Sequence, residues 1–171
     1  MKVQKIFTPF LSKIFTLLEM SYFNQRYTTY RSKYNIHKTF RFSGKNIELY
    51  GEGIITLGKE SYMGNNSTIQ SLEKQSVKIG DFVSISHNVR FYSSNRDPKY
   101  ICTESNIKPI YKSGNILIED NVWIGANCVI LEGTHIKNNV VVAANSILKG
   151  VYGPNCIVSS DKAKTVKTYN G

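Results

Sequence analysis

The 171-residue sequence has only three cysteines, and they do not cluster. Cys102, Cys128 and Cys156 are odd in number and far apart, so neither a disulfide framework nor a zinc site is predicted. We therefore expect no metal. A reducing, cytoplasmic setting fits this pattern best.

The sequence also lacks a long hydrophobic run. Met1–Met20 contains many apolar residues, but Lys2, Lys5, Lys13 and Glu19 interrupt them. No stretch reaches the roughly 18 apolar residues that a bilayer-spanning helix requires. We therefore expect no transmembrane helix.

Acidic residues are scarce, with 12 Asp and Glu against 22 Lys and Arg, which gives a formal net charge of +10. No helix-turn-helix, zinc-finger or RNA-binding motif accompanies this charge, so a nucleic-acid partner is not predicted. Much of the excess precedes Gly51, where nine basic residues face only Glu19 and Glu48. This asymmetry favours an anionic surface, and peripheral association with the inner membrane is one interpretation.

What the sequence does contain is a repeat of six residues. From residue 118 onward an aliphatic residue recurs at this spacing: Ile118, Ile124, Ile130, Ile136, Val142 and Leu148. The residue two positions before each is mostly small or apolar, so each pair points inward from a short strand. The same spacing occurs in Leu57–Ile69 and Ile79–Phe91, and Gly58, Gly64, Gly80 and Gly125 directly follow four of the aliphatic residues. Glycine at these positions permits tight corners.

A period of six excludes an α-helix with 3.6 residues per turn, whereas three such units form a triangular coil with one strand on each face. The sequence thus predicts an all-β solenoid, a left-handed parallel β-helix, over residues 51–158. A basic tail at 159–171 would follow it. Because stacked coils need capped ends, residues 1–50 are predicted to form the N-terminal cap.

The cap is expected to contain an amphipathic helix. Phe7, Phe10, Leu11, Ile14, Phe15 and Leu18 have helical spacing. We favour packing of this face over the first coil, with binding to a membrane surface as the alternative.

Two stretches interrupt the period, and insertions in a solenoid commonly carry functional sites. The shorter stretch is Gln70–Ser76. The longer one covers about 92–115 and predicts a looped-out arm that contains Asn95, Arg96 and Asp97.

The sequences from Asn121 to Ala126 and from Val141 to Ser146 resemble those of the hexapeptide-repeat acetyltransferases, in the branch of galactoside, maltose, streptogramin and surface-polysaccharide O-acetyltransferases. The resemblance implies a homotrimer in which acetyl-coenzyme A, the donor substrate, lies between neighbouring β-helices. It also implies roles for individual residues. Positions lining the coenzyme groove correspond to Trp123, Ala126, Ala144 and Ser146, and basic positions near its phosphates correspond to Lys149, Lys164 and Lys167.

The resemblance assigns Asn66 to the acceptor side, with Asn65 as the fallback. Asparagine also tolerates the left-handed conformation at coil corners, so a purely structural role stays open. Arg96 could hold an anionic sugar acceptor.

The general base is the unusual part of this sequence. Related enzymes use a histidine that opens the arm, but the matching segment here reads Asn95-Arg96-Asp97-Pro98. Arg96 stays protonated and cannot accept a proton. We consider His87 first and Asp97 second as the base, although His87 could instead be a hydrogen-bonding residue at a coil corner.

Two function classes follow from these observations. The favoured one is an O-acetyltransferase that acts on a sugar hydroxyl of a bacterial surface polysaccharide or its precursor. The alternative is a catalytically inactive trimeric β-helix that binds a ligand or serves as a scaffold.

Overall fold

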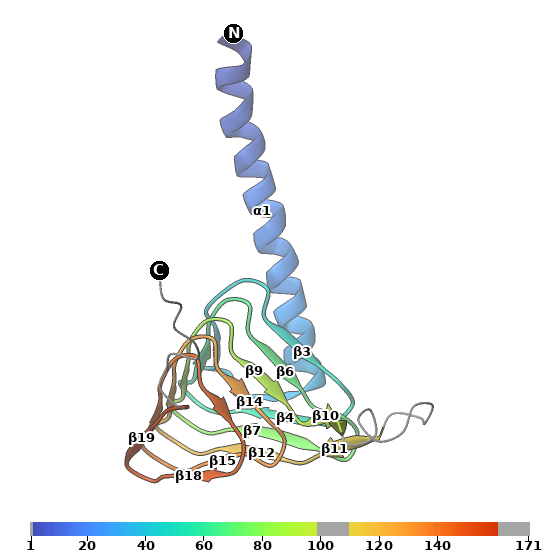
Figure 1. Ribbon diagram of the computed structural model, residues 1–171. Coiled ribbons are helices and arrows are strands. Elements are labelled where there is room, and N and C mark those ends of the chain that lie inside the picture. Colours follow the sequence, from blue (N-terminus) through green and yellow to red (C-terminus); the bar gives the residue numbers. More distant parts are fainter. Residues whose placement is uncertain (1, 99–109, 161–171) are drawn as a thin grey trace, which may run out of the picture.

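The computed structural model describes residues 2–98 and 110–160, and it consists of a stack of triangular coils with one long helix at one end (Figure 1). Each coil contributes one short strand to each of three parallel sheets. These sheets fit the predicted left-handed parallel β-helix.

When the two strands of the arm, residues 94–96 and 111–113, are left out, every third strand along the chain belongs to the same sheet, as the six-residue period requires. Sheet A contains β1 (Asn35–Ile36), β4 (Ile54–Leu57), β7 (Ser76–Ile79), β12 (Ile116–Ile118), β15 (His135–Ile136) and β18 (Val151–Tyr152). Sheet B contains β2 (Arg41–Phe42), β5 (Tyr62–Met63), β8 (Ser84–Ile85), β13 (Trp123–Ile124), β16 (Val140–Val142) and β19 (Cys156–Val158). Sheet C contains β3 (Glu48–Tyr50), β6 (Thr68–Gln70), β9 (Arg90–Tyr92), β14 (Val129–Ile130) and β17 (Ile147–Leu148).

The core is a column of the repeated aliphatic residues. Ile79, Ile118 and Ile136 are at most 2% exposed and follow one another in register across sheet A. Met63, Ile85 and Ile124 form the corresponding row in sheet B. Because both neighbours of each residue in a row belong to adjacent coils, the column is continuous through the stack.

The coils begin earlier than the sequence predicted. Strands β1, β2 and β3 pair in parallel with β4, β5 and β6, so residues 35–50 form a complete coil before the predicted start at residue 51. Its inward residues are Phe40, Ile47 and Leu49, which are at most 3% exposed. Their spacing departs from six, which is why the periodicity did not include them.

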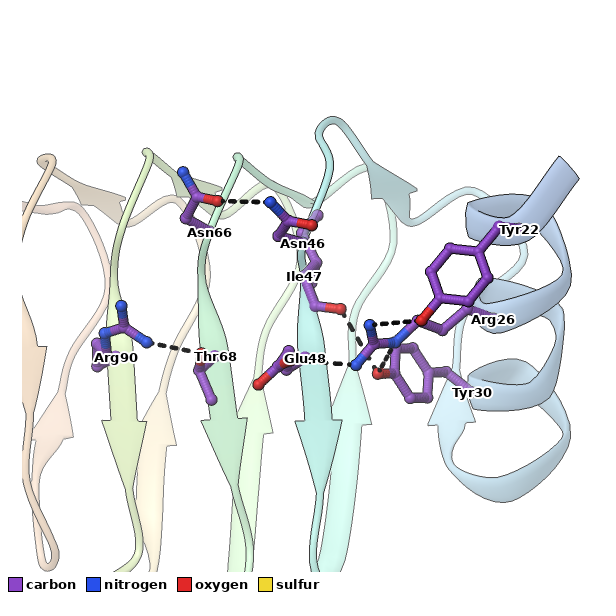
Figure 2. Close-up of polar contacts among 9 residues, drawn as sticks. All are labelled: Tyr22, Arg26, Tyr30, Asn46, Ile47, Glu48, Asn66, Thr68 and Arg90. Atoms are coloured by element: carbon purple, nitrogen blue, oxygen red, sulfur yellow. Dashed lines mark hydrogen bonds and ion pairs between the residues drawn. The ribbon is translucent and has the colours of Figure 1, made fainter. Parts of the chain in front are cut away.

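Helix α1 (Lys2–Lys33) covers the first coil with its C-terminal part. Tyr27 stacks on Phe42 with 4.4 Å between ring centroids, and Tyr30 and Tyr34 are buried beside it. Arg26 donates to Tyr30 Oη at 2.8 Å and to Glu48 Oε1 at 3.2 Å, which ties the helix to β3 (Figure 2).

The predicted cap was therefore wrong in the residues that it used. Phe10, Leu11, Ile14, Phe15 and Leu18 are exposed, and this part of α1 extends beyond the coils (Figure 1). Tyr27 and Tyr30 make the contact instead, because they lie on the side of α1 that faces the first coil. Tyr34, directly after the helix, packs with them. In the described part of the chain, no helix is long and apolar enough to cross a membrane.

The longer interruption of the period begins and ends as an antiparallel pair of strands at one corner of the stack. Strands β10 (Ser94–Arg96) and β11 (Tyr111–Ser113) pair with Asn95 opposite Lys112. Gly114 N–H donates to Ser93 O at 2.9 Å, which closes the base of this arm.

Candidate functional site

His87 lies at a corner between sheets B and C, where its imidazole takes part in a recurring structural contact. Its Nδ1 accepts a hydrogen bond from the backbone N–H of Asn65 in the preceding coil at 3.0 Å. Because Nδ1 is the acceptor, the neutral ring carries its proton on Nε2, and no ring lone pair is left to take another proton. This geometry favours the structural role of His87 over the role of general base.

The same contact occurs at other corners with other side chains. Asn65 Oδ1 accepts from Lys45 N–H, Asp81 Oδ1 accepts from Lys59 N–H, and Asn138 Oδ1 accepts from Asp120 N–H. In each case the acceptor follows a core aliphatic residue by two positions, as His87 follows Ile85. His87 therefore occupies a position that asparagine and aspartate also serve.

Asn66 lies at the next corner position, with the left-handed φ of 57° that asparagine tolerates. Its Oδ1 accepts from Asn46 Nδ2 at 3.1 Å, as Figure 2 shows. Asparagines also pair further along this corner, where Asn88 Nδ2 donates to Asn127 Oδ1. Asn66 and Asn88 do not pair with each other, because Asn88 Oδ1 accepts instead from Arg90, which also donates to Thr68. The Asn66 Nδ2 group has no hydrogen-bond partner within residues 2–98 and 110–160, so its amide protons are available to a ligand.

Three of the residues assigned to the coenzyme groove lie on the outside of the stack. Trp123 on β13 is 55% exposed, and Ala126 and Ala144 follow the sheet B strands at the corner with sheet C.

Ser146 differs from the other three. It is 1% exposed, and its Oγ accepts a hydrogen bond from Ser160 N–H at 3.3 Å. It points inward because it is the partner of Leu148 in an inward-facing pair. Its side chain therefore does not reach the surface of this chain, and its assignment to the coenzyme groove stays a prediction.

A buried carboxylate holds the base of the arm. Glu132, 6% exposed, accepts from Asn95 Nδ2 at 2.6 Å and forms an ion pair with Lys149 Nζ. Burial opposes ionisation of Glu132, but the hydrogen bonds from Lys149 and Asn95 outweigh it and hold the pKa of this carboxyl below its usual value. Strand β10 is thus tied to the coil that follows the arm.

Asp97 and Arg96 lie next to this cluster, at the end of β10. Asp97 is 9% exposed, its Oδ1 lies 3.2 Å from Lys112 Nζ, and its backbone N–H donates to Ile110 O. Arg96 is exposed. The ion pair with Lys112 holds the Asp97 carboxylate in place at the base of the arm.

Most of the predicted site residues thus form two groups, which lie at opposite ends of the strands of sheet C. The strands of this sheet start at the corner that carries Asn66, His87, Ala126 and Ala144, and they end at the corner that carries Arg96, Asp97 and Lys149. One chain does not bring the two groups together. Lys164 and Lys167 lie outside the described residues.

Sequence reasoning missed Asn95, Lys112 and Glu132 as members of the arm cluster. Asn95 and Glu132 are 37 residues apart, and nothing in the local sequence pairs them. An acidic residue within an otherwise regular repeat was the only available signal.

His135 belongs to neither group. It lies on sheet A, where its Nε2 is 2.6 Å from Glu119 Oε1. This hydrogen bond is the main cause of a lowered pKa of Glu119.

Comparison with known proteins agrees with this architecture. The profile of the family described as bacterial transferase hexapeptide (six repeats) matches residues 115–150. The chain is 32% identical over 136 aligned residues to WbbJ of Escherichia coli K12, a proposed lipopolysaccharide biosynthesis O-acetyl transferase, and the match covers 74% of this chain and 67% of WbbJ. It is 31% identical over 121 residues to the galactoside O-acetyltransferase of the same organism, covering 71% of this chain and 57% of that enzyme.

A solved structure resembles the fold over most of the chain. The hexapeptide-repeat acetyltransferase VCA0836 of Vibrio cholerae, complexed with acetyl-coenzyme A, superposes with a TM-score of 0.68 and 26% identity. The superposition covers 84% of this chain and 76% of that protein.

Proposed function

The chain belongs to the bacterial hexapeptide-repeat acetyltransferases, and we propose that it transfers an acetyl group from acetyl-coenzyme A to a sugar hydroxyl of a bacterial surface polysaccharide or its precursor. The main support is the structural similarity over 84% of the chain to an acetyltransferase complexed with acetyl-coenzyme A. The identity to the proposed lipopolysaccharide O-acetyl transferase WbbJ supports the sugar acceptor.

The reaction requires attack of the acceptor oxygen on the thioester carbonyl carbon. The C–O bond forms, the hydroxyl proton passes to a base, the C–S bond breaks, and the departing sulfur takes the proton from the base, so that the coenzyme leaves as the free thiol. A base and a donor to the developing oxyanion are needed. The candidates for the base and for the oxyanion donor belong to two groups of residues that lie apart within one chain.

We infer a homotrimer in which the site lies between neighbouring chains. Within one chain, sheet C separates the asparagine corner from the arm. Contact between the asparagine corner of one chain and the arm of the next would bring Asn66 and Asp97 to the same site. Trp123, Ala126 and Ala144 would then line the coenzyme groove beside it.

Within this site Asp97 is the better candidate for the base. It is at the arm position where the family has a histidine, its carboxylate is held by Lys112, and it is nearly buried. The ring nitrogens of His87 are already assigned to a corner hydrogen bond and to a proton. The Asn66 Nδ2 group, which has no hydrogen-bond partner among the described residues, is suited to donate to the acceptor or to the oxyanion.

Lys149 and Arg96 carry positive charge at the arm edge. Lys149 is 53% exposed at its side chain even though it pairs with Glu132, so it can still meet an anionic phosphate. Arg96 is exposed and suited to a carboxylated sugar. Lys164 and Lys167 stay candidates for the phosphates by resemblance alone.

The replaced arm histidine and the engaged imidazole of His87 favour a second function, a trimer that binds acetyl-coenzyme A without turnover. Free-thiol release from acetyl-coenzyme A, measured with neutral and acidic sugars, separates the two. Turnover that falls in Asp97→Asn but not in His87→Asn supports the enzyme with Asp97 as base. Binding of acetyl-coenzyme A by calorimetry without thiol release in any sugar supports the binding protein.

A further inference from the structure

The part of α1 that extends beyond the first coil carries an unusual number of exposed large apolar side chains. From residue 10 to residue 22, eight of them are 39–67% exposed: Phe10, Leu11, Ile14, Phe15, Leu17, Leu18, Met20 and Tyr22. Figure 1 shows this half of the helix extending away from the coils. Its apolar residues therefore contribute nothing to the core of the chain.

These side chains lie on the opposite side of α1 from the residues that contact the coil. At 100° per residue, all of them except Met20 fall within an arc of about 160°. Tyr27 and Tyr30, with Tyr34 directly after the helix, pack on the first coil and are centred about 170° around the helix from that arc. The projecting apolar face is thus turned away from the β-helix, and a small bend of α1 would not cover it.

Basic residues predominate in the N-terminal region that contains this face. Glu19 is the only acidic residue within Lys2–Lys33, and it forms an ion pair with Lys45 at 2.5 Å. Ser12, Lys13 and Thr16 are exposed on the side opposite to the apolar arc. Residues 1–50 contain nine basic and two acidic residues.

We propose that residues 9–22 of α1 bind along the surface of an anionic lipid membrane. The apolar face enters the boundary between headgroups and acyl chains, and the positive charge of residues 1–50 attracts the anionic headgroups. The segment spans about 21 Å at 1.5 Å per residue, which is less than the hydrocarbon core of a bilayer, about 30 Å thick. We therefore place it in the plane of the interface and not across the membrane.

A second copy of the chain would be a different occupant of this face. The apolar arc is wider than the narrow seam through which two helices of a coiled coil contact each other. It also carries the aromatic rings of Phe15 and Tyr22 along one side and belongs to an N-terminal region with nine basic and two acidic residues, features that suit an anionic interface.

The test is co-flotation of the full-length protein with two kinds of vesicle, one of phosphatidylcholine alone and one with about 30% phosphatidylglycerol, a content chosen to mimic an anionic leaflet. The variant Phe15→Ser/Leu18→Ser removes two apolar groups that touch nothing in the coil. The control Ser12→Gln/Thr16→Gln alters the opposite face of the same helical turns. Thermal unfolding of both variants checks that the coils are intact.

We expect the wild type and the control to float with anionic vesicles, binding to neutral vesicles to be weaker, and Phe15→Ser/Leu18→Ser to bind at least tenfold more weakly. Equal binding of that variant and the wild type would overturn the proposal. So would equal wild-type binding to both vesicle types, or a lipid-free mass that falls in Phe15→Ser/Leu18→Ser by sedimentation, which would assign the face to a second copy. None of these readouts depends on acetyl transfer.

Discussion

The structural role of His87 can be tested by comparing two substitutions at this one position. His87→Ala removes the acceptor for the Asn65 N–H, whereas His87→Asn places there the type of side chain with which Asn65 and Asn138 accept a backbone N–H at other corners. The two variants therefore separate loss of the hydrogen bond from loss of the imidazole.

The expected magnitude follows from the geometry. The bond is near the surface, so its loss should lower the free energy of unfolding by about 1 kcal/mol. For a chain of 171 residues this corresponds to a decrease in Tm of about 2–4 °C. His87→Asn should restore most of this decrease.

The reaction rates of the two variants separate a structural role of His87 from a catalytic one. If His87 serves only the corner, both variants should release thiol from acetyl-coenzyme A at close to the wild-type rate at 25 °C, where the protein is folded. If its imidazole were the general base, both would lose about 10²–10⁴-fold in rate. A His87→Asn variant with wild-type Tm and a hundredfold loss of kcat would refute our interpretation.

Further predictions concern the arm and the helix. Because the pKa of Glu132 is lowered in the folded chain, its carboxylate contributes stability above the unfolded pKa of about 4.3 and loses this contribution as the pH falls through the folded value. The destabilisation of Glu132→Gln in urea should therefore be larger at pH 7 than at pH 3, and an equal difference at both would contradict the assignment. Tyr27→Ala removes a ring stacked on Phe42 and a hydrogen bond to Gly44 O, so we expect a loss of about 2 kcal/mol in chemical denaturation, with Thr28→Ala on the exposed side as the control. Arg96→Gln should raise KM for a carboxylated sugar more than for a neutral one, and an equal change for both would remove Arg96 from acceptor recognition.

The sequence by itself determined the coil. The spacing of six, with inward-pointing aliphatic pairs, leaves no other regular structure that buries every pair, so the strands from β4 onward and the position of the arm could be predicted. The corner position of His87 could also be predicted. His87 follows Ile85 by two residues, and a residue with a side-chain acceptor likewise follows Met63, Ile79 and Ile136 by two.

Only the tertiary structure decided which groups the corners and the arm bring together. His87 meets a backbone N–H that is 22 residues earlier, and Glu132 meets Asn95 across 37 residues, contacts that depend on how coils stack. The contact face of α1 was likewise set by the first coil. The apolar stripe at residues 10–18 was the stronger local signal, but the aromatic residues 27, 30 and 34 lie where the chain turns onto Phe40 and Phe42. Local periodicity fixes which side chains share a face, whereas the partner of that face depends on the three-dimensional path of the chain.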